Sequence, residues 1–187
     1  MKKVLVMIAF MLSAMMANAQ EIELNEQGAY ERKEVFQIEG ATATQLYDRA
    51  MIALTDWTGA DGKSKAGIDY QNQETHTVIY KGTYYLGFKK AILGAGWNRY
   101  ANFTLKVRCK DGKAQVTVSV AGITGIYNKN GTTRQLTMSE VLDVTNDSKG
   151  KKKERRQEFV SQIVTGADNL VAAMGEKLKS GNTDEDF

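Results

Sequence analysis

Few residues of this sequence are suited to catalysis or metal binding. Its 187 residues include one cysteine, one histidine and no proline. Because a zinc site takes about four ligands from cysteine, histidine and carboxylates, the composition does not indicate one. A lone cysteine also excludes an internal disulfide. Without proline, the turns depend on glycine, asparagine and aspartate.

The sequence also lacks a strong excess of charge of either sign. Lysine and arginine number 25 against 22 aspartates and glutamates, which gives a formal net charge of +3. Nucleic-acid-binding domains usually carry a larger basic excess, so we expect no nucleic-acid partner. Neither a G-x-S-x-G elbow nor a phosphate-binding glycine loop with its lysine occurs. We therefore predict no cofactor and no enzymatic activity.

One long hydrophobic run is present, at the N-terminus. Lys2 and Lys3 precede an apolar stretch over 4–16, and Ala17-Asn18-Ala19 forms a small-x-small cleavage site. This pattern predicts a signal peptide over 1–19 and a mature start at Gln20, with an uncleaved anchor as the alternative. No cysteine near the cleavage site offers lipid attachment, and no later segment predicts a transmembrane helix. We expect a periplasmic or secreted protein.

The remaining chain reads as one domain with polar ends. Residues 20–29 are polar and are predicted to be a loose leader. Residues 30–180 have the length and apolar content of a single domain with a hydrophobic core. Within it, 139–180 is predicted to be mainly helical. Residues 181–187 are acidic, and we expect a disordered tail.

Hydrophobic periodicity divides the domain into strand and helix blocks. Alternation predicts strands over 30–39, 66–70, 77–88, 103–109 and 115–120, and less clearly over 123–127 and 132–138. In the third of these, Val78, Tyr80, Tyr84, Leu86 and Phe88 are predicted to share one face. Helical spacing predicts one helix from Thr42 or Thr44 to Gly59, a short one near Ser139, and a long one ending at Gly181. Asp111-Gly112 predicts a tight hairpin.

These blocks predict an α+β fold, a curved antiparallel sheet with two helices packed on one face. Each strand then has one buried face and one solvated face. The solvated face is expected to be polar, with Thr104, Lys106, Arg108, Gln115, Thr117 and Ser119. Cys109 falls in phase with the buried face, where it acts as a small hydrophobe. His76 is expected in an exposed turn.

Several of these segments resemble a known family. The stretches Glu34-Val35-Phe36-Gln37-Ile38-Glu39-Gly40, Leu46-Tyr47-Asp48-Arg49-Ala50 and Ile68-Asp69-Tyr70 carry the resemblance, together with 77–82 and the hairpin over 103–120. They look like the DUF4468 family of exported Bacteroides-type proteins, and the resemblance covers roughly 30–125. It implies a TBP-like fold and no established activity. A fold of this kind does not by itself imply DNA binding.

Two surface features are candidates for binding. A basic run includes Lys149, Lys151, Lys152, Lys153, Arg155 and Arg156, which fits an anionic surface, a solvated helix start or a linker. The segment over 89–100 is predicted to be a loop. Trp97 and Tyr100 in it, with Tyr84 or Tyr85 beside them, are predicted to form an aromatic contact for a ligand or partner. The alternative is a loop that closes the core.

The sequence thus favours a non-catalytic binding or interaction module of the cell envelope. Its partner would be an envelope protein, a glycan or a small ligand. The first alternative is a hydrolase that uses carboxylates such as Asp56, Asp61, Asp69 and Glu74. The second alternative is a structural envelope component. A cleft with two facing carboxylates would favour the hydrolase.

Overall fold

The computed structural model describes residues 22–57, 66–91 and 94–180. The described elements are, in order, β1 (Tyr30–Gln37), α2 (Ala43–Trp57), β2 (Gly67–Asn72), β3 (Thr77–Lys90), β4 (Gly96–Lys110), β5 (Lys113–Tyr127), β6 (Thr133–Thr137), α3 (Met138–Asn146) and α4 (Gly150–Ser180). The predicted signal peptide, the predicted acidic tail and Asp61 lie outside the described residues.

All six strands form one open antiparallel sheet, as the sequence predicted. The order is β1-β5-β4-β3-β2, and β6 pairs with the far half of β5. Lys110 pairs with Lys113, so Asp111 and Gly112 form the two-residue turn that the sequence indicated. Gly112 has a φ of 72°, which suits glycine. The fold is α+β, as predicted.

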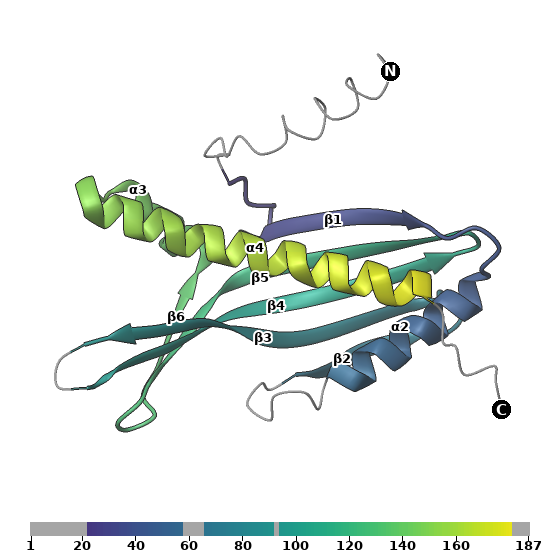
Figure 1. The fold of residues 1–187 in the computed structure, drawn as a ribbon, viewed down its shortest axis with the longest axis horizontal. Helices are drawn as coiled ribbons and strands as arrows, with labels where there is room; N and C mark the ends of the chain where they lie inside the picture. The colour runs from purple at the N-terminus through teal and green to yellow at the C-terminus, as the bar shows by residue number, and fades with distance from the viewer. Residues whose placement is uncertain (1–21, 58–65, 92–93, 181–187) are drawn as a thin grey trace, which may run out of the picture.

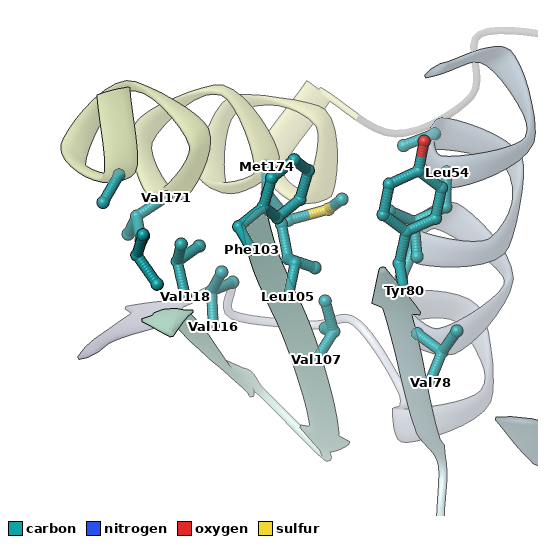
Figure 2. Packing of buried hydrophobic residues seen from close by; sticks show 14 of the residues in the cluster. Leu54, Val78, Tyr80, Phe103, Leu105, Val107, Val116, Val118, Val171 and Met174 are labelled. Carbon is teal, nitrogen blue, oxygen red and sulfur yellow. The ribbon is translucent and has the colours of Figure 1, made fainter. Parts of the chain in front are cut away.

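The helices α2 and α4 pack on the same face of this sheet (Figure 1). That face carries the alternating side chains that fill the core, among them Val78, Leu105 and Val116. Tyr80 lies beside Leu54 of α2, and Phe103 lies below Met174 of α4 (Figure 2). The short helix α3 packs against β5, β6 and α4. The two long helices on one face and the short helix near Ser139 are as predicted.

The start of α2 is fixed by local hydrogen bonds and by the β4–β5 turn. The Thr42 hydroxyl accepts from the Gln45 amide at 3.2 Å, and the Gln45 side chain accepts from the Thr42 amide at 2.9 Å. Asp111 Oδ1 accepts from the Ala43 amide at 2.8 Å. These acceptors satisfy N–H groups that a helix start leaves free. The hairpin that the sequence predicted therefore also anchors a helix.

The leader is more ordered than predicted. Asn25 Oδ1 accepts from the amides of Gln27 and Ala29, which closes a turn ahead of β1. Leu24 bridges to Tyr30 and, with Ile22, packs against the core. The prediction of a loose leader over 20–29 is therefore wrong for its described part. Two apolar side chains in a polar segment are enough to dock it.

A β-bulge in β3 changes which side chains share a face. Tyr85 pairs with Tyr100 and Gly87 with Arg99, so Leu86 is an extra residue. Gly87 has a φ of 96°, a conformation that glycine adopts readily. After the bulge, Phe88 pairs with Asn98 and points away from the core. The prediction that Phe88 shares a face with Val78 and Tyr80 is therefore wrong.

Candidate functional site

The face of the sheet opposite α2 and α4 is called the open face. Its side chains alternate with the buried ones on each strand and are half-buried or exposed, apart from Thr77. Its central part consists of Lys81, Thr83 and Tyr85 on β3, Asn98, Tyr100, Asn102, Thr104, Lys106, Arg108 and Lys110 on β4, and Gln115, Thr117 and Ser119 on β5. The two long helices α2 and α4 contact the sheet from its other face (Figure 1).

Two tyrosines form the aromatic centre of the open face. Tyr85 and Tyr100 pair across β3 and β4, and their ring centroids are 5.5 Å apart. The Tyr85 side chain is 56% exposed, and its hydroxyl donates to Asn98 Oδ1 at 3.4 Å. Phe88, 41% exposed, lies one pair further along the strands, with its ring beside Gly96. Tyr100 is half-buried, and an aromatic pair that is partly open to solvent can stack on a ligand.

The cations of the open face outnumber its carboxylates. Lys81 binds Asp69 at 3.0 Å, and Lys33 on β1 binds Glu31 at 3.5 Å. The other cations on this face have no carboxylate within 4.0 Å among the described residues; they are Lys106, Arg108, Lys110 and Lys113. The face therefore keeps a local positive charge although the whole chain is nearly balanced.

Tyr84 does not belong to this surface. Its ring lies on the helix side, 5.9 Å from the Phe103 ring, and its hydroxyl donates to the Ile163 carbonyl of α4 at 2.6 Å. Burial raises the pKa of the Tyr84 phenol above its usual range. Tyr84 therefore attaches α4 to the sheet, and only Tyr85 of the two neighbours faces outward.

Trp97 is also separated from the tyrosine pair. It lies in β4, two residues before Arg99, whose guanidinium lies 4.1 Å from the Phe159 ring centroid of α4. Alternation therefore places Trp97 on the helix side, where it packs on Tyr127 with centroids 5.2 Å apart. The predicted loop over 89–100 is wrong for Trp97 and Tyr100, because β4 begins at Gly96. The four predicted aromatics do not form one surface.

Apart from Lys149, which precedes α4, the basic run lies in helix rather than in a linker. Lys151, Lys152, Lys153 and Arg155 are exposed in the first turns of α4. Arg156 instead donates to the Val144 carbonyl and to the Ser148 hydroxyl at the end of α3. Cations at a helix C-terminus are favourable, so Arg156 fixes the α3–α4 corner. The four remaining basic side chains belong to α4, which lies on the opposite side of the sheet from the open face.

His76 and Cys109 occupy structural positions. His76 sits in the β2–β3 turn with a φ of 45°, its Nε2 lies 3.1 Å from the Thr44 hydroxyl, and its ring meets Tyr47 edge-on. Cys109 is 4% exposed, and burial raises the pKa of its thiol to about 12. A thiol that stays protonated is a poor nucleophile. Among the described residues, no three His, Cys, Asp or Glu side chains cluster closely enough to hold a metal ion.

A groove lies between β3 and α4, on the helix side. Its volume is about 820 Å³, and it runs from Trp57 of α2 past Gly87 to Glu158 and Leu170 of α4. Among the described residues, Glu158 is the only carboxylate that lines it. No aspartate or glutamate in the described ranges is buried. The described lining therefore holds one carboxylate rather than the two that a carboxylate hydrolase uses.

The open-face cations and Phe88 were not among the residues that we predicted from the sequence to bind. Lys106 and Arg108 were expected on the solvated face, but their lack of carboxylate partners depends on neighbouring strands. Phe88 was assigned to the buried face because nothing in the alternation reveals a bulge at Leu86. The signal available was Gly87 inside a strand, which often marks such a bulge.

Comparison with known proteins supports the fold. Residues 33–122 match the family described as domain of unknown function (DUF4468) with TBP-like fold. The structure is similar to a DUF4468 family protein from Bacteroides ovatus, with a TM-score of 0.65, 17% identity, and coverage of 89% of this chain and 94% of that chain. It is also similar to a TBP-like protein from Parabacteroides distasonis, with a TM-score of 0.62, 12% identity, and coverage of 86% and 99%. No curated protein matches the sequence.

Proposed function

With residues 33–122 matched to the DUF4468 family, as the sequence resemblance predicted, we propose that this protein is a non-catalytic binding module of the cell envelope. Its contact surface is the open face, with Tyr85 and Tyr100 at the centre. The family description carries a fold and no activity, so the proposal rests on geometry.

The observation that carries the proposal is the one-sided coverage of the sheet. α2 and α4 pack on one face and bury its central side chains, while the other face keeps an exposed Tyr85 paired with a half-buried Tyr100. Tyr85 gains nothing from the core in this position, and its exposed ring costs solubility. Tyrosine is favoured at binding surfaces because its ring packs and its hydroxyl bonds. A partner that covers Tyr85 and Tyr100 would explain both the exposure of the Tyr85 ring and the presence of tyrosine at these positions.

The two alternatives have less support. A carboxylate hydrolase needs paired acids with perturbed environments, whereas Asp69 is bound to Lys81 at the surface. A purely structural envelope component would have no need for exposed aromatics on a polar sheet. Tyr85 and Phe88 argue against that reading.

The proposed location is the periplasm or the cell exterior. It follows from the signal pattern over 1–19, with cleavage before Gln20. No helix in the described part of the chain is long and apolar enough to cross a membrane. Mass spectrometry of protein isolated from its own cells should give an N-terminus at Gln20, and an intact Met1 would contradict export.

Photo-crosslinking tests the contact surface directly. A photoreactive phenylalanine analogue replaces Tyr85 in one variant and Ile52 in another. Ile52 is 43% exposed on α2 and serves as the matched control. Irradiation of intact cells should give a higher-mass product from position 85 and not from position 52. Equal products from both positions, or none from position 85, would overturn the proposal.

A further inference from the structure

The open face of β4 arranges its side chains as one row with two different ends. From Asn98 to Lys110, every second residue points to this face. Neighbours in such a row are roughly 6.6–6.8 Å apart, because a strand advances 3.3–3.4 Å per residue. Asn98, Tyr100 and Asn102 lie at one end, and Lys106, Arg108 and Lys110 at the other. The row is long enough for a polymer rather than a single small molecule.

The cationic end is available for an anionic ligand. Lys113 pairs with Lys110 across the turn, and neither lysine forms an ion pair with a described carboxylate, because Asp111 between them accepts from the Ala43 amide instead. Arg108 donates to Gln115 Oε1, which is a neutral acceptor, and keeps its full charge. Like charges placed together in a sheet are unfavourable. An arriving anion would relieve that repulsion and gain charge-assisted hydrogen bonds.

The other end suits a ligand rich in hydroxyl groups. Tyr85 and Tyr100 offer ring faces, and Asn98 and Asn102 each carry an amide with donors and an acceptor. Asn102 and Thr124 exchange hydrogen bonds at 3.0 and 3.1 Å, which holds the amide in place. Sugar rings combine an apolar C–H face with hydroxyls at the edge. Tyrosine rings beside fixed amides match both parts.

We infer that the open face binds an anionic polysaccharide along β4. Its acidic groups pair with Lys106, Arg108 and the Lys110–Lys113 end, and its sugar rings pack on Tyr85 and Tyr100. This inference rests on the proposed function and adds the chemical class of the partner. The charge surplus of the face selects an acidic polymer over a neutral one.

A nucleic acid is the alternative ligand, because it is also a polyanion and its bases can stack on tyrosine rings. The sequence and the structure favour it less than a polysaccharide. Domains that bind nucleic acid usually carry a larger basic excess than the formal net charge of +3 found here. The two tyrosine rings meet each other at 53° rather than standing as separate parallel platforms for successive bases. Predicted export also separates the protein from nucleic acid.

Affinity electrophoresis or calorimetry with alginate, a polymer of uronic acids, tests this inference. Neutral dextran and a single-stranded DNA oligonucleotide are the comparison ligands. The test variant is Lys106→Glu/Arg108→Glu. The matched control, Lys152→Glu/Lys153→Glu, makes the same change in net charge on exposed lysines of α4. Circular dichroism confirms that both variants fold.

The native protein should bind alginate at low ionic strength and should not bind dextran. The open-face variant should lose at least about tenfold in affinity, and the α4 control should stay within about twofold. Tyr85→Ser/Tyr100→Ser should also weaken binding, including at high salt where charge is screened. An unchanged affinity in the tyrosine variant would overturn the assignment of the rings.

Other outcomes would overturn the inference in different ways. Equal losses in the two charge-reversal variants would mean unspecific attraction. Tighter binding of the DNA than of alginate would mean that the ligand is a nucleic acid rather than a polysaccharide. If the protein does not bind alginate, the assignment of an anionic polysaccharide as the ligand is wrong. A crosslink from position 85 and not from position 52 would still support the proposal that the protein is a binding module. Failure of both experiments would remove the function and the inference together.

Discussion

Gly166 allows α4 to sit close to the sheet, and its replacement gives the sharpest test of the packing. A Cβ at position 166 would lie 2.3 Å from Cε2 and 2.7 Å from Cζ of Tyr84. The Tyr84 ring cannot easily move, because its hydroxyl is bonded to Ile163 and its face rests on Phe103. We therefore expect Gly166→Ala to destabilise the protein, although alanine favours a helix.

The opposing contributions to the free energy of unfolding can be compared. Alanine instead of glycine in a helix interior stabilises by about 1 kcal/mol. Overpacking typically costs about 1–3 kcal/mol. Displacing the tyrosine would also break its hydrogen bond to Ile163, which contributes about 1 kcal/mol. The expected net loss for Gly166→Ala is therefore about 1–3 kcal/mol.

The background variant Tyr84→Ala removes the ring that causes the clash. In that background Gly166→Ala should become stabilising, by up to about 1 kcal/mol, so the sign of the effect reverses. Urea unfolding followed by circular dichroism measures all four proteins of the cycle. A stabilising Gly166→Ala in the native background would refute the close approach of α4 to Tyr84.

Two further predictions concern residues that the sequence singled out. Burial raises the pKa of the Cys109 thiol to about 12, so the thiol should not react with a disulfide reagent at pH 8 in the folded protein. In urea, the unfolded chain should react and release one equivalent of the reagent's thiol. Reaction of the folded protein at the rate of a free thiol would contradict the burial of Cys109. Trp97→Ala should cost less than the about 3–5 kcal/mol of a fully buried ring, because Trp97 is half-buried against Tyr127. The same variant should bind alginate like the native protein, since its ring lies on the helix side; a loss of binding with unchanged stability would return Trp97 to the contact surface.

The strands and helices could be predicted from the sequence because they follow from local patterns of apolar residues and turn residues. Alternation such as that of Phe103, Leu105 and Val107 records directly which side of a strand is buried. Asp111-Gly112 fixes a hairpin for local reasons too. The pairing of β1 with β5 is different, since it joins Tyr30 to Val120 and no local signal specifies it.

The candidate site was only partly readable, because it depends on registers and bulges. Tyr85 and Tyr100 were both identified, but their contact follows from the β3–β4 register. Tyr84 and Tyr85 point to opposite faces of the sheet, and strand alternation in the sequence is enough to predict this difference. Glycine in a helix interior lowers helix propensity, and no local signal shows what such a residue contributes to packing. Gly166 and Gly175 in fact provide space for the rings of Tyr84 and Phe36.

The position of β1 in the sheet has a consequence for how the chain assembles. β2 to β6 each pair with a strand next in sequence, so they can form by successive short loop closures. β1 must wait until β5 exists, some ninety residues later by its register with Val120. Until β5 has been synthesised, β1 has no strand to pair with and its backbone groups are free. Its central run, Glu31 to Glu34, consists entirely of charged residues, which discourages pairing with another chain until the proper edge has formed.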